Sequence, residues 1–168
     1  MNDSERKWPE VERRRSNKGR RSGTDRRSEE GWLAVPLDAR SSATLVETAT
    51  QARTLAQAPY SGFKVGAALE SSDGPVHTGC NVENASYSLT ICAERVALVK
   101  ALSEGHTRFT RIAVVADTPE PTPPCGPCRQ LLWEYCGDIE VILANLDGPQ
   151  ARHRLAELLP LPFDRRLL

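Results

Sequence analysis

Three cysteines and one glutamate have the residue types and spacing of a metal centre. Cys125 and Cys128 form a Cys-x-x-Cys pair, and Cys92 lies upstream with Glu94 two residues beyond it. A Cys-x-x-Cys pair alone fits half of a zinc site, a redox pair or a chance occurrence. The third cysteine, and prolines that bracket the pair in a register unlike that of thioredoxin-type motifs, favour zinc over redox chemistry.

The number of ligands separates a catalytic zinc site from a structural one. A structural zinc ion takes four protein ligands, whereas a catalytic one takes three and keeps a position for water. We interpret Cys80 and Cys136 as small buried side chains. The histidines are interpreted as ordinary loop or surface residues: His77, His106 and His153. Three ligands therefore remain, and the pattern predicts an open catalytic site.

Glu94 is close enough to such a site to act on the water without being needed as a ligand. Zinc lowers the pKa of a bound water toward about 7. A neighbouring carboxylate can then accept the proton at neutral pH. The alternative is a glutamate in an ordinary salt bridge, and we expect the proton-transfer role.

The positions of these residues depend on the elements around them. Apolar spacing and turn residues predict the following helices, strands and final helical turns. They are a helix over 43–56, strands over 65–70 and 76–82, a buried helix over 91–102, a strand over 112–116, a helix over 127–135, a strand over 139–143, and a last turn or two over 155–159.

The order of these elements indicates an α/β fold. Strand and helix alternate in the second half, which implies parallel pairing with helices covering the sheet, while the leading hairpin makes the sheet mixed. The three cysteines then fall at the starts of two adjacent helices. Exposed N–H groups and the positive end of a helix stabilise thiolates there.

Charge divides the chain into two parts. Residues 1–31 hold ten Lys or Arg against seven Asp or Glu, and the remainder holds twelve against fifteen. We expect residues 1–37 to be a disordered basic extension and residues 38–168 to be one catalytic domain. The extension either binds phosphates or is simply solvated, and we favour the solvated form without a part in catalysis.

The composition also bears on location. No apolar run approaches the roughly 20 residues that cross a bilayer, and the first thirty residues lack the apolar centre of a signal peptide. We expect a soluble cytoplasmic protein with no membrane partner. Five cysteines in a reducing compartment are better interpreted as ligands or buried thiols than as disulfides.

Larger blocks around these residues resemble the small homotetrameric cytidine deaminases. The signature is the zinc-deaminase one with three cysteines and a glutamate. The matching blocks are Pro-Tyr-Ser-Gly-Phe-Lys-Val-Gly-Ala-Ala at 59–68, Gly-Cys-Asn-Val-Glu-Asn-Ala-Ser-Tyr at 79–87, Ile-Cys-Ala-Glu-Arg at 91–95, Pro-Cys-Gly-Pro-Cys at 124–128 and Cys-Arg-Gln at 128–130. They span roughly residues 40–163.

The resemblance implies both a fold and a reaction. The fold would be a three-layer α-β-α arrangement with a mixed, mostly parallel sheet of about five strands. The reaction would be the hydrolytic deamination of cytidine and 2′-deoxycytidine to uridine and ammonia in pyrimidine salvage. One Zn²⁺ per subunit would be held by Cys92, Cys125 and Cys128, and Glu94 would carry protons from water to the base and then to the leaving amino group.

The same resemblance assigns substrate contacts. Phe63 would stack on the pyrimidine, Asn81 and Glu83 would bind the ribose hydroxyls, and the Ala93 N–H would face the base carbonyl. Arg95 would donate to the ligand thiolates and withdraw charge from them. The alternatives are a core phenylalanine and a strand-end turn.

Two further residues are implied at subunit contacts. Phe163 would complete the base pocket of a neighbouring subunit, or else plug its own subunit, and Tyr87 would lie in the interface near the site. The acceptor for the amino group would be a carbonyl in the Pro123-Pro124 segment. These prolines and Pro127 depart from the usual family pattern and affect fine specificity.

Three rival functions follow from the same residues. One is deamination of another substrate, such as an aminonucleoside antibiotic or a nucleotide, and the ribose contacts argue against it. A second is a structural zinc module whose basic arm binds nucleic acid, which requires a fourth ligand. The third is a zinc-thiol switch that releases its ion on oxidation. Polynucleotide binding is disfavoured because the body of the chain is acidic.

Overall fold

The computed structural model describes residues 39–168, which lie in one compact unit. The extension predicted over residues 1–37 lies outside the described residues. No helix among those described has both the length and the apolar character to cross a membrane.

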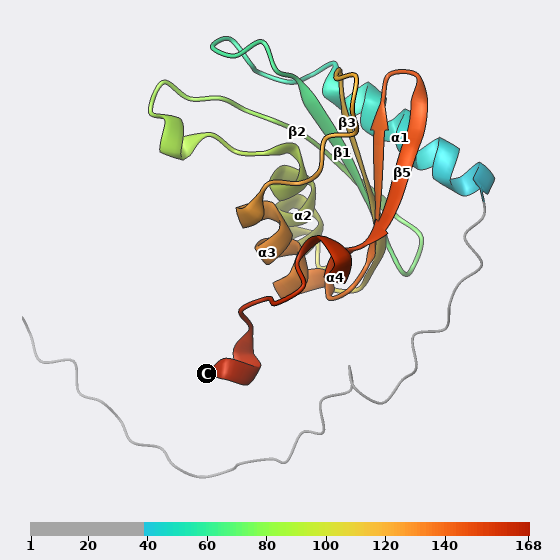
Figure 1. Cartoon of the computed structure of the whole chain (residues 1–168), viewed down its shortest axis with the longest axis vertical. Coiled ribbons are helices and arrows are strands. Elements are labelled where there is room, and N and C mark those ends of the chain that lie inside the picture. Colours follow the sequence, from blue (N-terminus) through green and yellow to red (C-terminus); the bar gives the residue numbers. More distant parts are fainter. Residues whose placement is uncertain (1–38) are drawn as a thin grey trace, which may run out of the picture. The chain divides into compact units, whose positions relative to one another are not determined.

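The described part contains four α-helices and one five-stranded sheet, with two short 3-10 helices at Tyr87–Leu89 and Arg165–Leu167 (Figure 1). In chain order the elements are α1 (Ala39–Arg53), β1 (Val65–Ser71), β2 (Val76–Cys80), α2 (Ala93–Ser103), β3 (Phe109–Ala116), α3 (Gly126–Cys136), β4 (Glu140–Asn145), β5 (Gly148–Arg154) and α4 (Leu155–Leu158). Apart from β5, each matches an element that the sequence predicts, with shifted ends.

The sheet is mixed, but the prediction that it is mostly parallel is wrong. The strand order is β2-β1-β3-β4-β5, and only β3 and β4 run parallel. Strands β3 and β4 are parallel because helix α3 between them returns the chain to the end of the sheet at which β3 began. The hairpin instead inserts β1 beside β3 in the antiparallel direction, with Val65 opposite Ala116.

Strand β5 was not predicted, because its sequence lacks alternating apolar residues. It reads Gly-Pro-Gln-Ala-Arg-His-Arg, and it pairs with β4 at the edge of the sheet. Edge strands tolerate proline and charged side chains because the backbone on one side of the strand forms no hydrogen bonds with a neighbouring strand. Its pairing with β4 is therefore set by the turn after Asn145 and not by a hydrophobic pattern.

Helices cover both faces of the sheet, which confirms the three-layer arrangement (Figure 1). Successive strand residues point to opposite faces. In β3, Ala113 and Val115 pack with Leu45 and Ala49 of α1. The alternate β3 residues pack into the other core, with the side chains of α2 and α3.

Two glycines allow helices to approach the sheet closely. A Cβ on Gly66 would overlap the backbone of Ala49 and Arg53 in α1, and a Cβ on Gly79 would overlap the backbone of Ala93 and Ala97 in α2. The first turn of α2 therefore lies directly on β2. This contact sets the position of the residues at the start of α2.

Candidate active site

The cysteines occupy the starts of α2 and α3. Cys92 and Cys125 are the N-cap residues of these helices, in extended conformation, and Cys128 lies in the first turn of α3. Pro127 sits in that same turn, where a missing N–H costs nothing. Both helix starts thus place a thiol where the helix dipole favours negative charge.

The three sulfur atoms lie close together. Cys92 Sγ and Cys125 Sγ are 3.9 Å apart, and the three ligand atoms all lie within 4.8 Å of one another. A tetrahedral zinc ion with bonds of about 2.3 Å requires its sulfur ligands to be about 3.8 Å apart. We call these three residues the cysteine cluster. Among residues 39–168 no fourth ligand joins them, so the donor set fits a zinc ion with one open position.

The charge in the cysteine cluster is already arranged for binding a cation. Hydrogen bonding from Cys128 is the main cause that lowers the pKa of Cys92 to about 6, with further contributions from Cys125 and the positive charge of Arg95. The pKa of Cys128 is raised because its thiol supplies the shared proton and is partly buried. One thiolate therefore forms first at Cys92, and Arg95 stabilises it.

Glu94 is held beside the cysteines with almost no contact with solvent. It is buried in the first turn of α2, and 5% of its surface is exposed. Burial is the main cause that raises its pKa to about 7, and the neighbouring charge of Cys92 adds to the rise, while the Cys128 thiol lies within hydrogen-bonding reach. A carboxyl group with such a pKa can both accept and return a proton near neutral pH.

Glu83 is fixed at the end of β2 by the segment before β1. Its carboxylate accepts hydrogen bonds from the backbone N–H groups of Tyr60 (2.9 Å) and Ser61 (3.2 Å) and from the Ser61 hydroxyl. The Ser61 hydroxyl is the first cause that lowers the pKa of Glu83, so the carboxylate remains ionised. The geometry presents an oriented anion that is linked to Phe63 through Ser61, whose hydroxyl oxygen accepts from the Phe63 N–H at 2.9 Å.

Asn81 positions the backbone around Phe63. Its Oδ1 accepts from the Val65 N–H and its Nδ2 donates to the Phe63 carbonyl, each at 2.8 Å. Asn81 is 7% exposed, and Phe63 is 40% exposed. Backbone hydrogen bonds of Gln57 with Asn81 and Glu83 hold the same segment. Asn81 thus orients Phe63 in addition to any contact it makes with a ligand.

The Ala93 backbone and the Pro124 carbonyl border the cysteine cluster. Ala93 is the first residue of α2 and is fully buried. The Pro124 carbonyl accepts a 2.6 Å hydrogen bond from Nε of Arg129, whose Nη1 donates to Leu158 at 2.7 Å. Sequence reasoning missed Arg129, although an arginine directly after Cys128 on a helix was a usable signal. Arg129 fixes the loop that carries Cys125.

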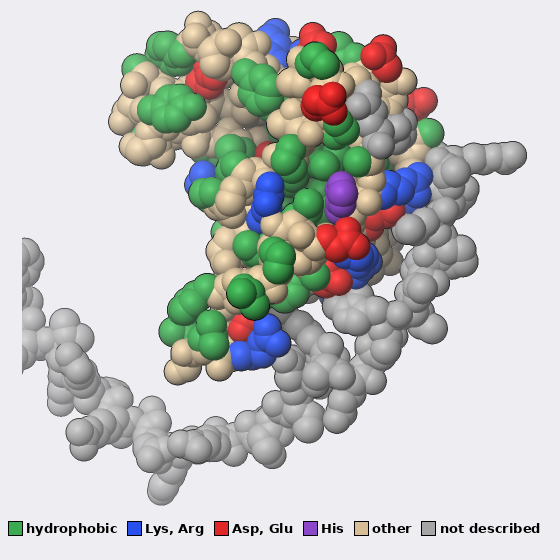
Figure 2. Space-filling view, viewed as in Figure 1, with side chains coloured by type: hydrophobic (Ala, Val, Ile, Leu, Met, Phe, Trp, Pro, Cys, Tyr) green, Lys and Arg blue, Asp and Glu red, His purple; other side chains and the backbone are tan. Residues whose placement is uncertain are grey.

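The C-terminal segment is attached to α3. Gln130 donates through Nε2 to the Phe163 carbonyl, and Trp133 Nε1 donates to Asp164 at 3.3 Å. The Phe163 side chain is 57% exposed and Tyr87 is 81% exposed. Figure 2 shows hydrophobic side chains on the projecting loops before α2 and on the C-terminal segment. Both residues therefore present apolar surface outward.

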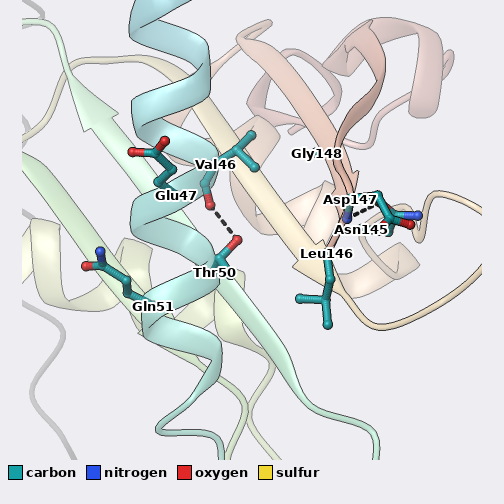
Figure 3. A pocket seen from close by; sticks show the side chains of 8 residues that line it. All are labelled: Val46, Glu47, Thr50, Gln51, Asn145, Leu146, Asp147 and Gly148. Carbon is teal, nitrogen blue, oxygen red and sulfur yellow. Dashed lines mark hydrogen bonds between the residues drawn. The ribbon is translucent and has the colours of Figure 1, made fainter.

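A shallow hollow of about 330 Å³ lies elsewhere, between α1 and the turn that joins β4 to β5 (Figure 3). Val46 and Thr50 line it from α1, and Asn145 to Gly148 line it from the turn. None of the predicted site residues borders it, and α1 covers the face of the sheet opposite to α2 and α3. The hollow is therefore separate from the cysteine cluster.

The expectation that all three histidines are loop or surface residues is wrong for His77. His77 lies in β2 and is 4% exposed, and its ring contacts that of His106 with 4.6 Å between centroids. The error arose because His77 was judged by its residue type, whereas alternation along β2 places it on the buried face of the strand. His153, in contrast, is part-exposed and pairs with Glu157.

Comparison with known proteins gives consistent matches. The family model described as the cytidine and deoxycytidylate deaminase zinc-binding region matches residues 39–144. A cytidine deaminase of Halalkalibacterium halodurans is 55% identical over 120 residues, covering 71% of this chain and 91% of that protein. A crystal structure of cytidine deaminase from Burkholderia pseudomallei is 50% identical in sequence, with a TM-score of 0.70. The match covers 71% of this chain and 97% of that chain. A blasticidin-S deaminase of Bacillus cereus is 31% identical over 131 residues, covering 72% and 91%.

Proposed function

The chain belongs to the cytidine and deoxycytidylate deaminase family and acts as a zinc-dependent hydrolase that deaminates cytidine, and we propose that Cys92, Cys125 and Cys128 bind its zinc ion while Glu94 transfers the protons. The single observation that supports this assignment is the buried carboxyl group of Glu94 beside three thiols that meet at two helix starts. The enzyme uses one zinc ion per subunit.

The reaction needs two proton transfers, and one carboxylate can carry both. When bound, zinc acidifies a water molecule so that it attacks near neutral pH. Glu94 takes the first proton from this water and gives it to ring N3 as the oxygen adds to C4. Glu94 then moves the second proton from the new hydroxyl to the amino group, the C4–N bond breaks, and uridine and ammonia form.

The proposed substrate contacts come from the segment before β1, the segment after β2 and the start of α2. We assign Phe63 to stacking on the base, the Ala93 N–H to the base carbonyl, and Glu83 with Asn81 to the ribose hydroxyls. Glu83 supports this role because its carboxylate is ionised, and the backbone of Tyr60 and Ser61 holds it in place. An aromatic face suits a planar base, and a carboxylate accepts from a diol.

Substrate choice tests the assignment against its rivals. The purified protein is mixed with cytidine, 2′-deoxycytidine, cytidine 5′-monophosphate and blasticidin S, and ammonia release is measured for each. We expect both nucleosides to react and the nucleotide to react far more slowly, because the anionic Glu83 repels a phosphate. Preferred turnover of blasticidin S, or of the nucleotide, would overturn the assignment of cytidine.

We extend the proposal to a homotetramer in which Phe163 completes the base pocket of a neighbouring subunit. The exposed rings of Phe163 and Tyr87 support an interface close to the site. Co-expressed Glu94→Gln and Phe163→Ala subunits test this. If Phe163 acts in trans, mixed oligomers recover activity that neither variant has alone. If Phe163 acts within its own subunit, mixing recovers none.

Residues 1–37 are proposed to take no part in this chemistry, which we assign to residues 38–168. Deletion of residues 1–37 is expected to change kcat/KM by no more than about twofold, the range of substitutions remote from functional features. We propose that the reaction takes place in the cytoplasm, because all five cysteines are free in the structure and free thiols persist in a reducing compartment.

A further inference from the structure

A second cluster of metal-binding side chains lies at the opposite end of α2. His77, Glu104 and His106 each offer a ligand atom, and these atoms lie within 4.8 Å of one another. Asp73 borders the same group, because its Oδ2 lies 3.3 Å from Nδ1 of His106. These four residues are here called the histidine cluster. It contains two of the three histidines in the whole chain.

Ordered turns bring these residues together. Gly74, with φ of +107°, closes the β1–β2 turn next to Asp73, and Gly105, with φ of +91°, ends α2 next to His106. The His106 N–H donates to the Ala101 carbonyl at 3.0 Å, as expected for a helix end with glycine in the left-handed region. The backbone that carries the donors is therefore set before any ligand binds.

The contacts of His77 show how a cation would enter. Its Nδ1 lies 2.8 Å from Oε2 of Glu104, and its Nε2 lies 3.1 Å from the Ser71 hydroxyl. The order Ser-His-Glu matches that of a hydrolytic triad, but Ser71 is 2% exposed and no substrate could reach it. A zinc ion between His77 Nδ1 and Glu104 Oε2 would replace the proton of their hydrogen bond. The two ligand atoms would then be about 3.3 Å apart, so they must separate by about 0.5 Å from their present distance.

The charges and access also suit a divalent ion. Two carboxylates face two imidazoles, so with both imidazoles neutral the cluster has a formal charge of minus two. A polar hollow of about 180 Å³, lined by Asp73 and His106 among others, opens beside it, although Arg108 also lines this hollow and offsets part of the charge. The side chain of Glu104 is 51% exposed, which leaves it free to adjust.

We propose that the histidine cluster is a second site for a divalent transition metal, with His77, His106 and Glu104 as ligands and with Asp73 orienting the ring of His106. Imidazole with carboxylate is a donor set that zinc accepts. The ion would join the β1–β2 turn to the end of α2, about 16 Å along an 11-residue helix from Cys92. This site is independent of the deaminase reaction and would stabilise the fold.

Zinc binding to the full chain, purified without a histidine tag and loaded at the cysteine cluster, tests the proposal. Equilibrium dialysis against zinc, followed by elemental analysis, should give about two zinc ions per chain for the parent. His106→Asn should weaken the second zinc by about tenfold or more. Asp73→Asn should weaken it in the same direction, because the carboxylate no longer orients His106. The thermal midpoint of the parent should rise with added zinc, and those of His106→Asn and Asp73→Asn should rise less.

His153→Asn is the matched control, since it removes the third histidine from an ion pair outside the cluster. It should keep both zinc ions, and cytidine turnover should be the same in the parent and in all three variants. His77 is left intact because its burial makes substitution a test of folding. Saturation of the parent at one zinc, or equal binding of a second zinc by the parent and His106→Asn, would overturn the proposal. Neither readout depends on cytidine turnover.

Discussion

Helix α2 has a cluster of potential metal ligands at each end, and the two clusters differ in the chemistry they support. At its start, the cysteine cluster lies beside the buried acid Glu94, and Ile91, just before Cys92, pairs with Val82 after β2. At its end, the histidine cluster has imidazoles and carboxylates that bond mainly to one another. The comparison teaches that ligand geometry alone allows binding, whereas catalysis also needs a buried proton carrier and a surface for the substrate.

The largest expected effect comes from removing one thiol. Cys125→Ala takes away the exposed member of the cysteine cluster, so the fold should survive while the zinc of this cluster is lost. Turnover of cytidine should fall by well over the 10- to 100-fold typical of groups that only orient ligands. Elemental analysis and ammonia release measure both quantities.

The control for this variant is Cys80→Ala, which removes a half-buried cysteine outside the cluster. It should keep zinc and turnover. The comparison between the ends of α2 predicts that Cys125→Ala still binds zinc at the histidine cluster. Full activity in Cys125→Ala would show that the cysteine cluster is not the reaction centre.

A smaller effect is expected from Glu83→Gln, which removes the oriented anion from the substrate surface. Hydrogen bonds to a charged group contribute about 1.5 to 3 kcal/mol. The kcat/KM for cytidine should therefore fall by about 10- to 100-fold, because each 1.4 kcal/mol is a factor of ten. Steady-state kinetics measure this loss.

A cytidine analogue that lacks the 2′- and 3′-hydroxyls sharpens the test of Glu83. With 2′,3′-dideoxycytidine, parent and Glu83→Gln should react equally, because the missing hydroxyls remove the interaction from both. Glu47→Gln, on the exposed side of α1, is the matched control and should behave as the parent. The same loss with both substrates would show that Glu83 has a structural role only.

Gly79→Ala tests whether β2 positions the start of α2. The added methyl group overlaps the backbone of Ala93 and Ala97, so one of the two elements must shift. Overpacking of this kind costs about 1 to 3 kcal/mol, to be measured by denaturant unfolding. Gly126→Ala is the control, because its Cβ meets nothing within 4 Å. Equal stability of the two variants would contradict the close contact.

The smallest effect concerns the pH at which single thiols react. Hydrogen bonds from Cys128 lower the pKa of Cys92 to about 6, whereas burial raises the pKa of Cys136 to about 12. A thiolate forms as pH rises through its pKa. In the metal-free protein, iodoacetamide labelling of Cys92 should therefore rise near pH 6, and Cys136 should stay unlabelled below pH 9. Peptide mass spectrometry of a pH series reads this out.

The sequence contained most of the information for the cysteine cluster. Helix starts fall where proline and apolar spacing place them, so Cys92, Cys125 and Cys128 could be assigned to adjacent helix ends before the structure was known. The position of Glu94 beside them was expected from its place two residues after Cys92, whereas its burial is known from the structure. These features are local, because a cap and its first turn depend on residues within a few positions.

Features that depend on pairing between distant segments could not be predicted in the same way. The direction of β1 beside β3 depends on how the hairpin enters the sheet, and β5 pairs at an edge without a hydrophobic pattern. His77 and His106 are brought together by two turns from separate parts of the chain. Arg129 reaches Pro124 and Leu158 only after α3 and α4 are packed.

The most direct test of the account is Glu94→Gln, compared with the parent for zinc content and for conversion of cytidine to uridine followed by ultraviolet absorbance. We predict that the variant keeps its zinc and loses about 10²- to 10⁴-fold in kcat, since it can no longer carry protons. Turnover at the parent rate by the zinc-loaded variant, or no conversion of cytidine by the zinc-loaded parent, would contradict the assigned chemistry.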